Sequence, residues 1–248
     1  MIQADELIIG KNAVNEALRA KRQIDTVYVD RDNNSEIIKS LIFKAKKSGA
    51  LIKTVDSKKL DFMCAQGNHQ GIIAKASSYE YFSVDDILNS SKNENKFIVI
   101  CDGISDPHNL GAIIRSAECM GADGVIIPER RSASVNFTVS KASAGAVEYI
   151  KIARVTNLLN TVSKLKKEGL WIYGADMHGE NLKKTDMTGN IAVVIGSEGK
   201  GISQKMKENC DFLISIPLYG KIDSLNASVA AGIILNEVAI QRKEGKND

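Results

Sequence analysis

The feature that most constrains the fold is a series of nearly continuous apolar runs in the second part of the chain. They are Phe97–Cys101, Gly124–Ile127, Tyr149–Val155, Leu170–Tyr173, Ile191–Ile195 and Phe212–Ile216. Strands that are apolar on both faces belong to parallel sheets whose two faces are covered by helices, and the stretches between these runs have helical character. The pattern therefore predicts an α/β domain built on a mostly parallel sheet.

The first 76 residues predict a second, smaller α/β domain. Short apolar runs at 7–9, 26–29, 51–55 and 71–74 alternate with amphipathic stretches. In the stretch 35–47, apolar residues recur at spacings of three and four and predict one buried helix stripe: Ile37, Ile38, Leu41, Ile42 and Ala45. Residues 77–95 are polar and turn-prone, so we predict a linker there, between domains at 1–76 and 96–248.

Composition and cysteine spacing exclude several classes of protein. The chain has 248 residues, 44% of them apolar, but no run of about 18 apolar residues, so no membrane span is expected. The first residues lack the basic start and apolar stretch of a signal peptide, which predicts a cytoplasmic protein. The four cysteines lie far apart, and we interpret them as buried thiols rather than ligands of a metal or a disulfide framework: Cys64, Cys101, Cys119 and Cys210.

The charge is unevenly distributed along the chain. Residues 1–76 carry 13 Lys and Arg against 9 Asp and Glu, a balance of +4. The remaining residues carry 20 against 21, a balance of −1. A basic front domain is consistent with a phosphate-bearing partner, and an ordinary solvated surface explains the charge equally well.

Three segments place polar residues directly after predicted strands, where open α/β sheets bind their ligands. The first runs from Asp106 to Glu118 and includes Asn109 and Arg115. On a helix, Arg115 lies about 140° around from Leu110 and points away from the core. Asn109 has the position of a helix N-cap. In isolation, a solvated arginine and a capping residue account for both.

The second and third segments are a glycine-rich loop and a helix entrance. Gly196–Gly201 follows a buried strand, and its glycines expose backbone N–H groups to a ligand. It matches neither the phosphate loop nor the dinucleotide fingerprint, so a plain turn is the alternative. In the segment 216–230, Ser224 and Asn226 precede a predicted helix rich in small residues, and capping alone would explain them.

Taken together and in this order, the three segments resemble the three motifs of the SpoU family of the SPOUT superfamily, the RNA ribose 2′-O-methyltransferases. Two front segments, 9–14 and 68–74, resemble the ends of the substrate-binding domain in the branch that modifies large-subunit ribosomal RNA. The resemblance implies S-adenosylmethionine as cofactor and a C-terminal SPOUT domain with a trefoil knot. It also implies a homodimer that acts on structured RNA, with a guanosine of 23S ribosomal RNA as the expected target.

The resemblance also assigns site residues. The polar active-site positions are Asn109, Arg115, Glu198, Ser224 and Asn226. The cofactor positions are Ala175, Gly196, Ile216 and Leu225. Candidate RNA contacts in the front domain are Lys11, Arg19, Lys21 and Arg22, and no metal is implied. Since a guanidinium does not readily lose a proton, our hypothesis is that Arg115 binds the adjacent phosphate and polarises the ribose hydroxyl.

Three other functions are compatible with parts of the sequence. A transfer RNA ribose 2′-O-methyltransferase shares the same motifs. A noncatalytic RNA-binding factor for ribosome assembly or resistance is a second alternative, and the polar residues Asn109, Arg115, Glu198 and Asn226 argue against it. A nucleotide-binding α/β enzyme is a third, and the missing phosphate loop argues against that.

Overall fold

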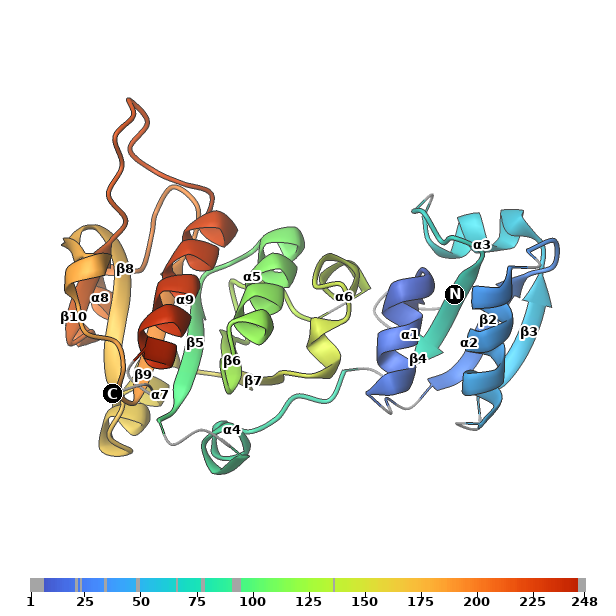
Figure 1. Ribbon diagram of the computed structural model, residues 1–248, viewed down its shortest axis with the longest axis horizontal. Helices are drawn as coiled ribbons and strands as arrows, with labels where there is room; N and C mark the ends of the chain where they lie inside the picture. Colours follow the sequence, from blue (N-terminus) through green and yellow to red (C-terminus); the bar gives the residue numbers. More distant parts are fainter. Residues whose placement is uncertain are drawn as a thin grey trace. The chain divides into compact units, whose positions relative to one another are not determined.

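The computed structural model describes residues 7–20, 22, 24–33, 35–47, 50–65, 67–76, 79–90, 95–135 and 137–244. They form two compact units, each with its own sheet and core (Figure 1). The first unit comprises Met1–Glu80 and Val135–Tyr149, and the second comprises Tyr81–Ser134 and Ile150–Asp248.

The first unit is a four-stranded sheet with helices on both faces. The strands, in the order β1-β4-β2-β3, are Leu7–Ile9, Ile72–Ala76, Ile24–Asp30 and Leu51–Val55. Only the pair β2 and β3 is parallel. Helices α1 (Lys11–Arg19) and α2 (Glu36–Lys47) share one core cluster with Ile8, whereas α3 (Ser57–Met63) packs with Leu7 and Ile9. This division follows from the alternation of side chains along a strand.

The predicted stripe of α2 is narrower in the structure than in the sequence. Ile38, Leu41 and Ala45 are buried and Ile42 is partly buried, but the Ile37 side chain is 60% exposed. At 100° per residue, Ile37 lies at the edge of the arc that these four residues occupy. The expectation that Ile37 is buried is therefore wrong.

Two short helices from far along the chain pack in the first unit. They are α6 (Phe137–Ala142) and the 3-10 helix η2 (Ala146–Glu148). Arg22 forms an ion pair with Glu148 at 2.8 Å, and the two side chains are only 14% and 5% exposed. Burial raises the pKa of Glu148, and the Arg22 charge opposes that rise. The predicted division into continuous domains therefore differs from the structure.

The second unit contains a six-stranded sheet in which every neighbouring pair is parallel. In the order β10-β8-β9-β5-β6-β7, its strands are Phe212–Ser215, Trp171–Asn181, Ile191–Gly196, Phe97–Asp102, Gly124–Pro128 and Lys151–Val155. All six arise from the apolar runs, so the predicted α/β fold with a parallel sheet is confirmed. The main difference is β8, which is longer than its apolar run.

Helices cover both faces of this sheet. One core cluster joins alternate strand residues such as Ile98 and Ile100 to α4 (Val84–Ser90), α7 (Leu158–Lys167) and α8 (Gln204–Asn209). Helix α5 (Pro107–Cys119) contacts β6, α9 (Ala227–Glu244) contacts β9, and the two helices pack against each other (Figure 1). A 3-10 helix, η3 (Leu182–Lys184), follows β8 and contacts α9.

The segment predicted as a linker contains a helix of the second unit. Ser83 and Asp86 form a reciprocal capping box, in which the Asp86 N–H donates to Ser83 Oγ at 3.1 Å and the Ser83 N–H donates to Asp86 Oδ2 at 2.8 Å. The helix that follows, α4, buries Ile87 and Leu88 in the core. The polar residues that indicated a linker are therefore partly the cap of a packed helix.

Across the described ranges, every helix is too short or too polar to span a lipid bilayer.

Cys64 and Cys101 are buried, and burial raises the pKa of Cys101 to about 12. Cys119, at the end of α5, is exposed and Cys210 is only partly buried, so the expectation of four buried thiols is confirmed for two residues, wrong for Cys119 and only partly met by Cys210.

Candidate active site

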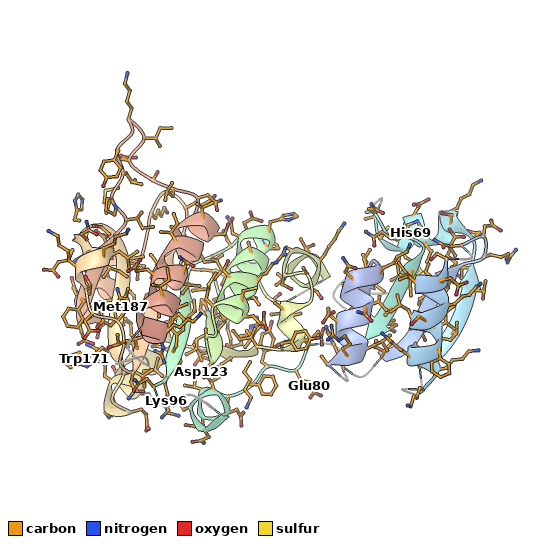
Figure 2. All side chains as sticks on the ribbon, viewed as in Figure 1. His69, Glu80, Lys96, Asp123, Trp171 and Met187 are labelled. Atoms are coloured by element: carbon orange, nitrogen blue, oxygen red, sulfur yellow. The ribbon has the colours of Figure 1, made fainter. Side chains whose placement is uncertain are left out.

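The carboxyl ends of β8, β9 and β10 surround a cavity of about 780 Å³. Its wall is formed by residues 175–178, 195–201 and 214–225 apart from Tyr219, together with Lys207 and the first turns of α9. Lys96, Asp123 and Trp171, labelled in Figure 2, mark the opposite, amino-terminal end of the sheet. A volume of this size is typical of small-molecule sites, and such sites lie at this end of open α/β sheets.

The glycine loop after β9 is closed on itself. The Ser197 N–H donates to the Gly201 carbonyl at 3.1 Å, and the Gly201 N–H donates to the Ser197 carbonyl at 2.9 Å. Gly199 and Gly201 adopt φ angles of 76° and 63°, which side chains rarely tolerate. A Cβ at Gly196 would lie 2.1 Å from the Gly201 backbone, so only glycine fits there. The loop thus presents its backbone to the cavity.

Asn109, Glu198 and Asn226 form one hydrogen-bonded network. Asn226 Nδ2 donates to Asn109 Oδ1 at 3.0 Å, and Asn109 Nδ2 donates to Glu198 Oε1 at 3.0 Å. The Asn226 amide also donates to the same Glu198 oxygen. These residues come from the three separate polar segments, and Asn109 is buried. The fold therefore brings together three of the five predicted polar positions.

The caps of the two helices differ from each other. The cap of α5 is Asp106, whose Oδ1 accepts the His108 N–H at 3.0 Å, and Pro107 takes the first helical position. The prediction of an N-cap at Asn109 is therefore wrong, because that residue lies inside the first turn. Asn226 does cap its helix, since its Oδ1 accepts the backbone N–H of Ser228 at 2.9 Å, while its amide joins the network.

Arg115 and Ser224 lie outside this network. Arg115 is exposed on α5, as its helical angle predicts. Within the described part of the chain, it has no hydrogen-bond or ion-pair partner, so its guanidinium is available to an external anion. Ser224 lines the cavity beside the entrance to α9.

The four positions predicted to contact a cofactor all lie on the cavity wall. Ala175 comes from β8, Gly196 from the end of β9, and Ile216 and Leu225 from the loop between β10 and α9. This loop projects from the carboxyl end of the sheet (Figure 1). Three segments that are far apart in sequence thus contribute to one surface.

An ion pair in the cavity wall, between Asp176 and Lys207, was not predicted from the sequence. The Asp176 side chain is 7% exposed and pairs with Lys207, and Asp176 Oδ1 accepts the His178 N–H at 3.0 Å. Burial alone would raise the pKa of Asp176, but the hydrogen bonds from Lys207 and His178 outweigh it, so its pKa lies below the usual value. The pair therefore places two opposite charges directly in the wall.

A bulge in β8 puts Asp176 in this position. In the pairing with β10, Leu213 is opposite Gly174 but Ile214 is opposite Glu180, so residues 175–179 leave the ladder. A Cβ at Gly179 would lie 2.4 Å from the Ile214 nitrogen, which explains the glycine. The signal in the sequence was the pair of glycines around a polar stretch that continues an apolar strand.

The predicted RNA contacts of the first unit have different surroundings. The Arg19 side chain is 63% exposed, and Lys11 is partly exposed. Lys21 lies outside the described residues. Arg22 is held in the buried pair with Glu148, so its prediction as an RNA contact is withdrawn: a guanidinium paired in this way is not presented to a phosphate. In the described ranges, no three His, Cys, Asp or Glu side chains gather as a metal site would require.

Two family models match this chain over most of its length. Residues 96–236 match the SpoU rRNA Methylase family. Residues 7–82 match a domain described as RNA 2′-O ribose methyltransferase substrate binding. The first match covers the three polar segments. The second covers the part of the chain that carries the net positive charge.

Individual proteins are similar over nearly the whole chain. YacO of Bacillus subtilis (strain 168), named for the TrmH family of tRNA/rRNA methyltransferases, is 44% identical over 245 residues, which cover 98% of each chain. The structure of the SpoU methyltransferase AviRb from Streptomyces viridochromogenes, in complex with AdoMet, has a TM-score of 0.80 at 24% identity and covers 96% of this chain and 91% of its own. The AdoMet-bound rRNA methyltransferase from Sinorhizobium meliloti also has a TM-score of 0.80 at 24% identity, with coverage of 94% and 85%. At this identity the two structures show the shared fold.

Proposed function

Because this chain belongs to the SpoU rRNA methylase family, we propose that it methylates a ribose 2′-hydroxyl of large-subunit ribosomal RNA in the cytoplasm, with S-adenosylmethionine as methyl donor. Its general activity is that of an RNA methyltransferase. The observation that carries the proposal is the network of Asn109, Glu198 and Asn226 beside a cavity walled by a glycine loop. The proposed target is a guanosine.

The chemistry of the cavity wall fits S-adenosylmethionine. The ligand combines an apolar, flat adenine with polar groups that need hydrogen-bond partners. The wall offers apolar surface at Ile216 and Leu225 and accessible backbone at Gly196, where a Cβ would not fit. We propose that these residues and Ala175 hold the cofactor. When bound, it would supply a methyl group on a positively charged sulfur. As the ribose oxygen bonds to the methyl carbon, the carbon–sulfur bond would break, the sulfur would leave as a neutral thioether, and the hydroxyl proton would pass to solvent.

The residues of the chain would align and activate the ribose. We propose that Arg115 binds the phosphate next to the target and polarises the 2′-hydroxyl, because an arginine side chain stays charged at neutral pH and cannot serve as the base. Asn109 and Asn226 would hold the Glu198 loop in place, and Ser224 would contact the substrate from the cavity rim. Alignment of this kind can lower a reaction barrier strongly.

Single-turnover methylation of a ribosomal RNA transcript tests the role of Arg115. We expect Arg115→Ala to slow the reaction about 100-fold, and Arg115→Lys to recover part of the rate because it restores the charge without the planar fork. Calorimetry with S-adenosylmethionine is the control, and the affinity of both variants should equal that of the wild type. Rates near the wild type in both variants would remove Arg115 from the mechanism.

The identity of the RNA is tested by mapping 2′-O-methyl groups on ribosomal and transfer RNA from strains with and without this protein. A mark that disappears from large-subunit ribosomal RNA supports the proposal and names the nucleotide. A mark that disappears from transfer RNA instead would assign the chain to that substrate. No lost mark, together with no binding of S-adenosylmethionine, would favour a noncatalytic RNA-binding factor.

The proposal includes the homodimer and the trefoil knot that the family implies. Helix α9 supports the dimer, since Val229 and Ile233 are 50% and 41% exposed although they are apolar. Sedimentation velocity should show a dimer, and Ile233→Glu should shift it to the monomer. A monomeric wild type at micromolar concentration would contradict the dimer. The path of the chain through the second unit in an experimental structure tests the knot.

A further inference from the structure

Helix α2 carries an exposed aromatic side chain among lysines. The Phe43 side chain is 71% exposed. Lys39, Lys46 and Lys47 are exposed on the same helix, whose buried residues are Ile38, Leu41 and Ala45. The core of the first unit therefore does not use Phe43.

The spacing on the helix puts these residues on one side. At 100° per residue, Lys39, Phe43, Lys46 and Lys47 lie within an arc of about 100°, directly opposite the buried stripe. Lys39 and Lys47 are each one turn from Phe43, about 6 Å along the axis. We call these four residues the Phe43 face.

The charge of the Phe43 face is only partly compensated. Lys39 forms an exposed ion pair with Glu36 at 2.7 Å. Within the described residues, Lys46 and Lys47 form no ion pair. An exposed pair of this kind contributes little energy and is easily exchanged for another anion. The surface thus combines an aromatic ring with a net positive charge.

We propose that the Phe43 face binds the RNA substrate, with the Phe43 ring stacked on an unpaired base and the lysines in contact with the neighbouring phosphates. The inference rests on the proposed function, because it assumes RNA as substrate. Single-stranded RNA is bound in this way by proteins that combine aromatic rings with basic side chains. A protein partner is a poorer fit, because it would have to desolvate Lys46 and Lys47 to cover the ring.

The Phe43 face contains none of the basic residues that the sequence suggested as RNA contacts. Those lie at or just after α1 in the sequence, and Arg22 among them is held in its ion pair with Glu148. Ile37 provides a matched control on α2 itself, since it is apolar and 60% exposed but lies about 120° from Phe43 around the helix. Lys44 is the matched control for the lysines of the Phe43 face. It lies about 100° from Phe43 around the helix, and its Nζ donates a hydrogen bond to Asn15 Oδ1 at 2.9 Å.

The experiment uses the full chain and a transcript of large-subunit ribosomal RNA. Equilibrium binding is measured at several salt concentrations, and methylation is measured as kcat and KM. We expect Phe43→Ala to weaken RNA binding and raise KM about tenfold, and Phe43→Trp to bind like the wild type. The double variant Lys46→Gln and Lys47→Gln should reduce the dependence of affinity on salt. The value of kcat and the affinity for S-adenosylmethionine should not change.

The controls decide between binding and indirect effects. Ile37→Ala and Lys44→Gln should bind RNA like the wild type, and all variants should keep the melting temperature. Wild-type affinity in Phe43→Ala would overturn the inference, as would an equal loss in Ile37→Ala. A change of sedimentation without a change of RNA affinity would show that the Phe43 face binds a second copy instead. A wild-type protein that neither binds nor methylates RNA would contradict the proposed function itself.

Discussion

Asn226 Nδ2 donates a hydrogen bond to Asn109 Oδ1 at 3.0 Å, and this contact joins residues that are 117 positions apart. The other side of the same amide group caps α9, because Asn226 Oδ1 accepts the backbone N–H groups of Ser228 and Val229. One side chain therefore starts a helix and connects that helix to α5 and to the Glu198 loop. Stability and alignment of the site are coupled at this residue.

Substitutions at Asn226 should separate the two roles. Asn226→Ser keeps a capping oxygen but loses the amide, whereas Asn226→Ala loses both. We expect both variants to slow single-turnover methylation about 100-fold, because Asn109 and Glu198 lose a common donor and the loop shifts. The two variants should differ in stability: Asn226→Ala should lower the free energy of unfolding by about 1 kcal/mol relative to Asn226→Ser, because it removes the cap. A fast Asn226→Ser enzyme would show that only the cap matters.

Gly196 should be intolerant of any side chain. The Cβ of Gly196→Ala would lie 2.1 Å from the Gly201 backbone, so the loop would have to move. We expect the dissociation constant for S-adenosylmethionine, measured by calorimetry, to rise at least about tenfold. The reason is that moving a loop to relieve overpacking costs roughly 1–3 kcal/mol of free energy. Gly220→Ala is the control, because Gly220 lines the same cavity and has open space around it. Equal affinities in the two variants would contradict the role of the loop.

The Asp176–Lys207 pair should make stability depend on pH. The pKa of Asp176 is lower in the folded chain than its usual value of 3.8, so the ionised carboxylate stabilises the fold above that value. This contribution is lost as the pH falls through the folded-state pKa. We expect Asp176→Asn to lower the unfolding free energy by about 2 kcal/mol at pH 7, and the difference from the wild type to shrink from about pH 5 towards pH 3.

Denaturant unfolding at a series of pH values measures this effect. Asp223→Asn is the control, since Asp223 lines the same cavity but is exposed and has no ion-pair partner among the described residues. It should be as stable as the wild type at every pH. A difference between Asp176→Asn and the wild type that stays constant with pH would show that the charge of Asp176 is not responsible.

The buried pair of Arg22 and Glu148 should hold the segment 135–149 in the first unit. Arg22→Ala leaves a buried carboxylate without its partner, which we expect to cost about 3 kcal/mol of unfolding free energy. Adding Glu148→Gln should recover part of this loss, because the unpaired charge is removed. Arg19→Ala removes an exposed pair with Glu16 and should cost less than about 1 kcal/mol. If the losses of unfolding free energy in Arg22→Ala and in Glu148→Gln simply add up in the double variant, the two side chains do not stabilise each other.

The elements of the fold follow closely from local sequence pattern. Each apolar run from Phe97 onward forms a strand of the parallel sheet, and the glycine loop follows its strand directly. These predictions succeed because apolar periodicity reports which faces of a strand or helix are buried. They fail where a short polar stretch contributes a cap, as Ser83 and Asp86 do for α4.

The composition of the site depended on contacts between distant segments. The sequence by itself determined that Asn109, Glu198 and Asn226 are polar residues next to strand ends, but for Asn109 it favoured a cap. Tertiary structure decided that Asp106 caps the helix and that Asn109 bonds to the other two residues. It also decided that Asp176 enters the wall and that Arg22 pairs with Glu148, because the partner of a polar side chain depends on which segments lie side by side, whereas periodicity depends only on neighbours along the chain.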